Sequence, residues 1–150
     1  MDQALLDLYN AKILELAAKV ERGARLTHPD ATISKESPLC GSRITVDLVM
    51  QDGKVSDYGQ IVKACALGTA ASSLMAKLII GKTAAQLCQL RDDMRALLTE
   101  AGSPPGPPFK EFEILTPVVP WKSRHGSVML PFEAAAEAAE IASHIKSGKN

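Results

Sequence analysis

Aromatic side chains, a surplus of charge of one sign, and long hydrophobic runs are all missing or scarce in this sequence of 150 residues. Aromatic residues make up 4% of it while hydrophobic residues reach 46%, so a core must be built mainly from Ala, Leu, Val, Ile and Met. The 17 basic and 17 acidic side chains balance, which removes the basic surface that nucleic-acid-binding proteins present. No segment approaches the roughly 20 apolar residues of a membrane-spanning helix. We therefore expect neither nucleic acid nor membrane as a partner.

Cysteine is also scarce, with three residues in all. An odd number in a chain of this length does not suggest a small secreted protein held together by disulfides. The first ten residues, MDQALLDLYN, are acidic and amphipathic, and they lack the basic end and apolar run of a signal peptide. Both features favour a reducing environment, so we expect a cytoplasmic location.

The length suits one domain, and one low-complexity segment interrupts it. Residues 102–108 read GSPPGPP, and prolines neither continue a helix nor donate hydrogen bonds to a strand. This segment is predicted to be a loop. The roughly forty residues after it are too few to bury a core alone. We therefore expect residues 1–150 to form a single domain with the C-terminal segment docked on the rest.

Apolar residues at three- and four-residue spacings predict four helices. The third begins with a capping box at Thr83 and Gln86, whose side chains would satisfy two unpaired N–H groups. The last is rich in alanine, with Ser127 expected as its N-cap and an acidic face expected to meet solvent. The predicted helices span residues 5–20, 66–79 and 84–101 and a final stretch ending near His144.

Strict alternation of apolar residues over 44–50 predicts a half-buried strand. Asp52 and Gly53 follow, a pair that favours a tight hairpin turn, and residues 55–62 are predicted as the return strand. Residues 31–34 are a weaker candidate for an edge strand. The order of elements indicates an α+β fold, in which a small antiparallel sheet carries helices packed on one side, among them an N-terminal and a C-terminal helix.

The predicted hairpin brings two cysteines to the same end of the sheet. Pairing about the Asp52–Gly53 turn places Cys40 opposite Cys65, and Cys65 also falls at a helix N-terminus, where the helix dipole favours an anion. Two thiols held together in this way suit a soft metal, an iron–sulfur cluster or redox exchange. The alternative is that both are small buried apolar residues, since free cysteine is often fully buried.

The residues around both cysteines resemble the IscU/NifU/SufU family of iron–sulfur cluster assembly scaffolds. Residues 38–46, PLCGSRITV, resemble the first cysteine loop of that family, and residues 65–68, CALG, are similar to its second cysteine segment. The resemblance is clear over residues 36–90. It implies an α+β fold and a transient iron–sulfur cluster, with Zn²⁺ or iron as alternative metals at the same ligands. The implied partners are a cysteine desulfurase and iron–sulfur acceptor proteins.

The sequence departs from the family pattern at two ligand positions. The family has an aspartate two residues after the first cysteine, where this sequence has Ser42. Its third cysteine would fall at Gly126 or Ser127, and neither is a cysteine. His125 is the candidate third metal ligand beside Cys40 and Cys65, because a neutral imidazole binds iron and zinc well. The alternative is a solvated loop histidine.

Three functions remain open at this point. The first is a non-enzymatic, scaffold-like protein that binds a labile cluster, iron or zinc through Cys40 and Cys65 for transfer to acceptor proteins. His125 would be a third ligand, and a homodimer bridging a cluster would supply others. The second is a degenerate scaffold relative without a cluster that acts through protein interactions. The third is a zinc-dependent acceptor of persulfide sulfur. Cys88 has no counterpart in the resemblance and is expected to be a structural or surface cysteine.

Overall fold

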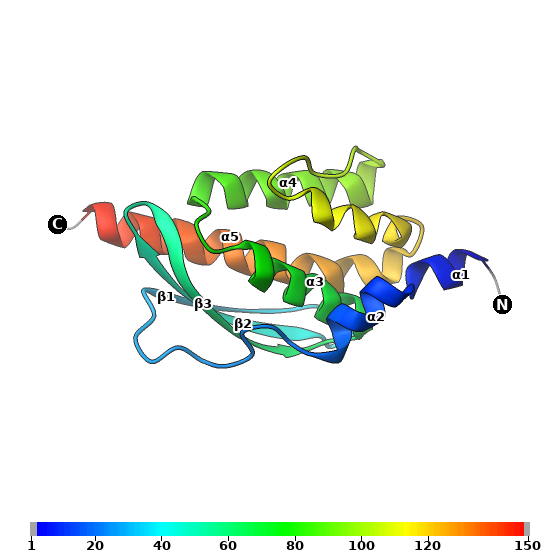
Figure 1. The fold of residues 1–150 in the computed structure, drawn as a ribbon, viewed down its shortest axis with the longest axis horizontal. Helices are drawn as coiled ribbons and strands as arrows, with labels where there is room; N and C mark the ends of the chain where they lie inside the picture. The colour runs from blue at the N-terminus through cyan, green and yellow to red at the C-terminus, as the bar shows by residue number, and fades with distance from the viewer. Residues whose placement is uncertain (1–2, 149–150) are drawn as a thin grey trace.

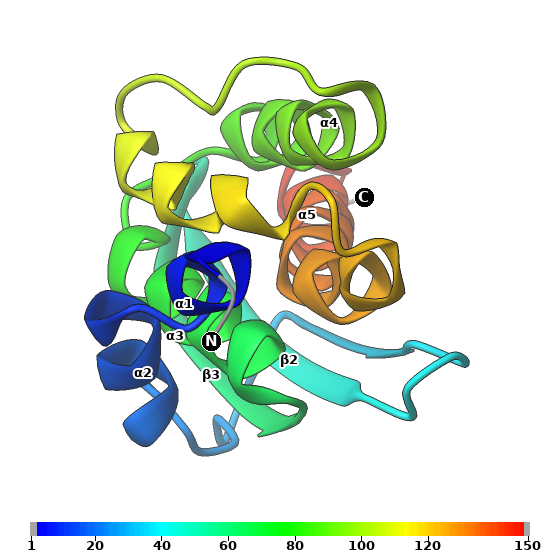
Figure 2. The ribbon, with the colours of Figure 1, turned by 90° about the vertical axis from the view of Figure 1, so that its right-hand side faces the viewer.

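The computed structural model describes residues 3–148, in which a three-stranded sheet carries the long helices on one face. Figures 1 and 2 show α3, α4 and α5 stacked over the sheet, with α5 running along it. The α+β architecture predicted from the sequence is confirmed. No helix within residues 3–148 is long and apolar enough to cross a membrane.

The sheet consists of β1 (Ala31–Glu36), β2 (Arg43–Gln51) and β3 (Lys54–Lys63), antiparallel and in that order. The alternating apolar residues of β2 all point into the core: Ile44, Val46, Leu48 and Met50 are at most 1% exposed. Asp52 and Gly53 both adopt positive φ, as the predicted turn requires. The three predicted strands are thus confirmed and are slightly longer than expected.

The register of the hairpin differs from the prediction by one residue over most of its length. Met50 pairs with Val55 as the turn predicts, but a bulge between Val49 and Met50 shifts the ladder, so that Arg43 pairs with Lys63. The predicted pairing of Cys40 with Cys65 is therefore wrong, because a bulge adds one residue to one strand. Both cysteines nonetheless flank the same end of the hairpin.

The N-terminal segment forms two helices, α1 (Gln3–Leu8) and α2 (Ala11–Ala18), so the prediction of one helix over residues 5–20 is wrong. Asn10 separates them. Its Oδ1 accepts a hydrogen bond from the Ile13 N–H at 3.0 Å, and its Nδ2 donates to the Asp7 carbonyl at 2.8 Å. An asparagine that bonds backbone groups on both sides ends one helix and starts the next.

The remaining helices are α3 (Ala66–Leu78), α4 (Ala84–Glu100) and α5 (His125–Gly148), with 3-10 segments η1 (Lys110–Val118) and η2 (Lys122–Arg124) between α4 and α5. The capping box of α4 is confirmed: Thr83 Oγ1 accepts from Gln86 N at 3.1 Å, and Gln86 Oε1 accepts from Thr83 N at 2.9 Å. The loop at 102–108 is also confirmed. The prediction that Ser127 is an N-cap is wrong, because α5 already begins at His125.

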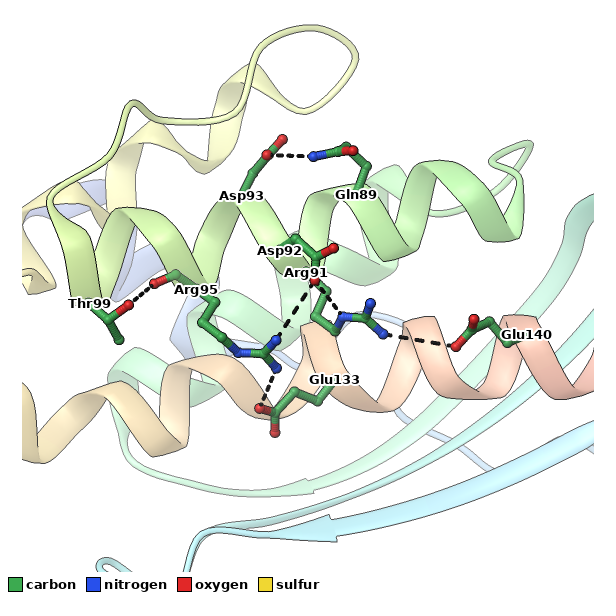
Figure 3. Close-up of polar contacts among 8 residues, drawn as sticks. All are labelled: Gln89, Arg91, Asp92, Asp93, Arg95, Thr99, Glu133 and Glu140. Carbon is green, nitrogen blue, oxygen red and sulfur yellow. Dashed lines mark hydrogen bonds and ion pairs between the residues drawn. The ribbon is translucent and has the colours of Figure 1, made fainter.

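Helix α5 joins the sheet to the other helices. Its alanine face and Phe132 are fully buried, and the Phe132 ring centroid lies 4.8 Å from that of Phe112 in η1. The small alanine side chains let α5 approach its neighbours closely. Its acidic face does not simply meet solvent as predicted: Glu133 pairs with Arg95 at 3.3 Å, and Glu140 lies 3.9 Å from Arg91, so carboxylates of α5 face the guanidinium groups of α4 (Figure 3).

Candidate functional site

Cys40 lies in a tight loop between β1 and β2. The loop is closed by two backbone hydrogen bonds, from Ser37 N to Ser42 O at 2.8 Å and from Gly41 N to Ser37 O at 2.9 Å. Gly41 has a φ of +72°, a conformation that glycine adopts without strain. Leu39 is 84% exposed and Cys40 is exposed beside it. The loop therefore presents the Cys40 thiol to solvent from a hydrogen-bonded base.

Cys65 follows β3 directly and is the N-cap residue of α3, as the sequence predicted. Its carbonyl accepts the first helical hydrogen bond from Thr69 N at 2.9 Å, while its side chain makes no capping bond. The thiol is half-buried. Cys65 thus lies where the unpaired N–H groups of a helix start favour a negatively charged group.

Two serine hydroxyls join the two thiols. Cys40 Sγ lies 3.1 Å from Ser42 Oγ, which lies 3.1 Å from Ser127 Oγ, and this last oxygen lies 3.5 Å from Cys65 Sγ. Ser42 is 5% exposed and Ser127 1%. These four side chains, which we call the thiol–hydroxyl cluster, come from the β1–β2 loop, the start of α3 and the first turn of α5.

Two glycines let the first turn of α5 reach the cysteines. A Cβ on Gly68 of α3 would collide with Ser127 Oγ, and a Cβ on Gly126 would come within 2.6 Å of Ser37 Oγ. A Cβ atom cannot come this close to an oxygen atom, so side chains at these two positions would force the hydroxyls of Ser127 and Ser37 to move. The absence of a side chain at Gly68 gives the Ser127 hydroxyl its place beside Cys65.

The surroundings of Cys40 favour its thiolate. Hydrogen bonds from Ser37 and then from Ser42, together with the positive charge of Arg124, lower the pKa of Cys40 to about 7, although partial burial opposes them. A thiol with this pKa is substantially ionised at neutral pH, and the thiolate is the form that binds metals and acts as a nucleophile. Cys40 is therefore both accessible and chemically prepared for either role.

Cys88 is placed differently. It lies half-buried on α4, packed against the hydrophobic core. Burial, followed by the nearby Glu140 carboxylate, raises its pKa, so its thiol stays protonated and unreactive at neutral pH. This half-buried position, packed against the core, agrees with the expectation of a structural or surface cysteine.

His125 starts α5 and lies half-buried. Its Nε2 is 2.9 Å from the Val119 carbonyl oxygen and 3.2 Å from that of Val118. Since carbonyls only accept, Nε2 carries the proton and donates. Within residues 3–148, no three His, Cys, Asp or Glu side chains form a group able to hold a metal ion. The structure thus brings Cys40 and Cys65 to one site without gathering His125 around the same point, and the role of His125 stays a prediction.

Sequence reasoning missed what the two serines do. Ser42 was noted only as the residue in place of a carboxylate, and Ser127 was assigned to a helix cap, yet both are buried between the thiols. One signal pointed to Ser127: in the resemblance, counting back from Ala134 along the last helix places the third cysteine at this position, whereas anchoring on His125 places it at Gly126. Of these two residues, Ser127 contacts Cys65 whereas Gly126 faces Ser37.

The sequence matches a known protein family and a characterised relative. Residues 8–107 match the family described as NifU-like N terminal domain. The iron–sulfur cluster assembly scaffold protein IscU of Streptococcus pyogenes serotype M1 is 24% identical over 151 residues, which span 95% of this chain and 94% of that protein.

Solved structures extend the likeness to the fold. The crystal structure of a nitrogen-fixing NifU-like protein (N-terminal) from Brucella abortus has a TM-score of 0.91 and 43% identity, covering 94% of this chain and 98% of that one. A putative iron–sulfur cluster assembly scaffold protein for the SUF system from Fervidobacterium islandicum AW-1 has a TM-score of 0.82 at 16% identity, covering 89% and 98%. At that identity the second likeness speaks for the fold alone.

Proposed function

This chain belongs to the NifU-like N-terminal domain family of iron–sulfur cluster assembly scaffolds, and we propose that it carries a labile iron–sulfur cluster on Cys40 and Cys65 for transfer to acceptor proteins. The observation that carries the proposal is the thiol–hydroxyl cluster, in which two thiols from separate elements share one site. Iron–sulfur clusters are held by cysteine thiolates, and Cys40 is ionised in part at neutral pH.

The same donor set explains why the cargo would be labile. Two thiolates are fewer than the four cysteines that commonly hold a cluster, so exchangeable ligands must supply the rest. Cys40 is exposed, which lets an acceptor protein reach the metal. Iron or Zn²⁺ alone would bind at the same two sulfurs, because both metals accept thiolate ligands.

His125 is the proposed third ligand. Its Nε2 donates to the carbonyls of Val118 and Val119, which leaves Nδ1 as the unprotonated nitrogen. Metal-binding histidines usually donate their other ring N–H to such a carbonyl, which fixes the tautomer. Binding through Nδ1 would require the start of α5 or the Cys40 loop to move, and a second copy of the chain bridging the cluster is the other source of ligands.

In this proposal the protein is a carrier rather than an enzyme. A cysteine desulfurase supplies sulfur, and iron–sulfur proteins in the cytoplasm receive the product. Support for these partners comes from the likeness to the IscU scaffold protein of Streptococcus pyogenes serotype M1 and from the exposed position of Cys40. The surface around Leu39, 84% exposed next to Cys40, is where a partner would meet the site.

The test is anaerobic reconstitution with Fe²⁺ and sulfide, followed by iron analysis and visible absorbance. We expect the wild-type protein to bind iron, and Cys40→Ser and Cys65→Ser each to lose most of it. Cys88→Ser is the matched control, because this cysteine lies outside the site, and it should bind as much iron as the wild type. A wild type without iron, or site variants that bind as much as Cys88→Ser, would contradict the proposal.

One observation favours a second function. Ser42 and Ser127 place neutral hydroxyls between the two thiols, and a hydroxyl is a poor metal ligand, which fits a scaffold relative that keeps the fold and acts by binding proteins. Metal-free protein that binds a cysteine desulfurase stably, with undiminished binding by Cys40→Ser, would favour this function over the carrier.

A further inference from the structure

Ser127 occupies an unusual position between the two thiols. Its hydroxyl oxygen lies 3.5 Å from Cys65 Sγ and 3.1 Å from Ser42 Oγ, which in turn lies 3.1 Å from Cys40 Sγ. Ser127 is 1% exposed, so its side chain points into the site rather than into solvent. Gly68 leaves open the space that this side chain fills.

The residues that precede Ser127 in α5 do not place a side chain between the two thiols. Gly126 has no side chain and packs on Ser37, and Nε2 of His125 is engaged by two backbone carbonyls. Ser42 contacts Cys40 and Ser127 from the opposite side. Among the side chains of the first turn of α5, that of Ser127 is therefore the one that reaches the thiol–hydroxyl cluster.

The chemistry of an oxygen at this point differs sharply from that of a sulfur. A serine hydroxyl is neutral and hard, whereas a thiolate is anionic and soft and is preferred by iron, zinc and cobalt in sulfur-rich sites. A hydroxyl here satisfies the hydrogen-bonding groups of the site and adds no negative charge. The site consequently offers two sulfur ligands, with a neutral oxygen 3.5 Å from the sulfur of Cys65.

We infer that Ser127 is the specificity-determining residue of this site: because it places an oxygen rather than a sulfur beside Cys65, metal binding stays weak and reversible. This inference rests on the proposed function, because it concerns the same two cysteines. On this inference, a single atom separates the site from a three-sulfur metal site. Replacing the Oγ of Ser127 by sulfur gives one chain three thiolates, which together hold a tetrahedral metal ion.

The experiment is an anaerobic titration with Co²⁺, whose thiolate complexes absorb characteristically in the near ultraviolet. Ser127→Cys should bind Co²⁺ about 100-fold more tightly than the wild type, with stronger thiolate-to-cobalt absorbance because a third sulfur is bound. Adding Cys65→Ser to Ser127→Cys should abolish the gain. Circular dichroism and urea denaturation check that Ser127→Cys keeps the fold.

Two matched controls separate the position from the added thiol. Ser127→Ala removes the hydroxyl without adding a ligand and should bind Co²⁺ as weakly as the wild type. Ser143→Cys adds a thiol to the same helix, far along it and beside the hairpin turn, and should also bind weakly. Folded Ser127→Cys that binds no more tightly than Ser143→Cys would overturn the inference.

The outcomes also separate this inference from the proposed function. Tight, Cys65-dependent binding by Ser127→Cys, together with a wild type that takes up no iron, supports the inference and contradicts the carrier function. A wild type that holds iron through Cys40 and Cys65, together with no gain in Ser127→Cys, supports the carrier and overturns the role of Ser127.

Discussion

The hydroxyl oxygens of Ser42 and Ser127 lie 3.1 Å apart, although 85 residues separate them in the sequence. This contact ties the first turn of α5 to the loop that carries Cys40 and, through Ser127, to the start of α3. Two buried serines thus link the elements that carry the two cysteines. This polar contact between neutral groups helps to hold the two cysteines at one site.

The reactivity of Cys40 should depend on the serines around it. Removing a hydrogen bond to the thiolate disfavours the charged form, so Ser37→Ala and Ser42→Ala should raise the pKa of Cys40 from about 7 toward the ordinary value of about 8.5. Rates of iodoacetamide modification, followed at Cys40 by mass spectrometry across pH 5.5–9.5, would show the midpoint moving upward and the rate at pH 7 falling.

The control for this prediction is Thr69→Ala, near Cys65 but bonded to Ala64 O rather than to Cys40. Its Cys40 profile should match that of the wild type. Of the two serine variants, Ser37→Ala should cause the larger shift, because its hydrogen bond is the largest cause of the lowered pKa of Cys40. An unchanged midpoint in both serine variants would show that other groups stabilise the thiolate.

Gly68→Ala should destabilise the protein, even though alanine is by itself the better helix residue by roughly 0.5–1 kcal/mol. The new Cβ collides with Ser127 Oγ, so the hydroxyl must turn away from Cys65 and Ser42. We expect the free energy of unfolding to fall by about 1–2 kcal/mol, as for other overpacked sites. Urea denaturation measures this change.

A double-mutant cycle assigns that cost. In a Ser127→Ala background the colliding oxygen is gone, and Gly68→Ala should then cost at least about 0.5 kcal/mol less than in the wild type. Gly106→Ala serves as the control, because a Cβ there meets nothing within 4 Å. Equal costs of Gly68→Ala in both backgrounds would mean that the collision with Ser127 is not the cause.

The elements best predicted from the sequence were those with a regular pattern. The alternation over residues 44–50 reflects a strand with one buried face, and the capping box at Thr83 is a local signal that needs no tertiary contact. The helix break at Asn10 could not be predicted from apolar spacing, because that spacing continues from α1 into α2. The break is caused by hydrogen bonds of the Asn10 side chain, which do not alter the spacing. The bulge after Val49 could not be predicted either, because counting residues outward from the turn assumes that both strands contribute equal numbers.

The candidate site was only half predictable for a different reason. Cys40 and Cys65 are brought together by the hairpin, which is local enough to predict. Ser127 reaches them through η1 and η2, short 3-10 segments that include Pro117 and have no long periodicity to detect. Where α5 begins therefore depended on tertiary packing, and with it the identity of the residue beside Cys65.

Stability should fall in acid because of Asp47, whose side chain is fully buried in β2. Burial alone would raise its pKa, but hydrogen bonds from Arg25 at 2.6 Å, Thr32 at 2.6 Å and Leu26 N at 2.9 Å outweigh this and lower it. A carboxylate with a depressed pKa in the folded state stabilises the protein above its unfolded pKa of about 3.9, and this contribution is lost as the pH falls below about 5.

Asp47→Asn tests that account. The variant should be less stable at pH 7 by about 1–3 kcal/mol, because the charge-assisted bonds are lost in a buried position, and its stability should change less than that of the wild type between pH 6 and pH 3. Asp57→Asn, whose partly exposed carboxylate faces Arg22, is the control and should keep the wild-type pH dependence. If the free energy of unfolding of Asp47→Asn fell with decreasing pH as steeply as that of the wild type, Asp47 would be excluded as the acid-sensitive group.

The role of His125 can be separated from its structural contacts. His125→Gln keeps a side chain that can donate to the carbonyls of Val118 and Val119, so the free energy of unfolding should change by less than about 1 kcal/mol. If the unprotonated Nδ1 is the third ligand, the variant should still lose iron faster to a chelator after anaerobic reconstitution, by about 10-fold. His28→Gln, at an exposed loop position, should release iron like the wild type. Equal rates of iron release from all three proteins would show that His125 only fixes the start of α5. A second copy of the chain would then be the source of the missing ligands.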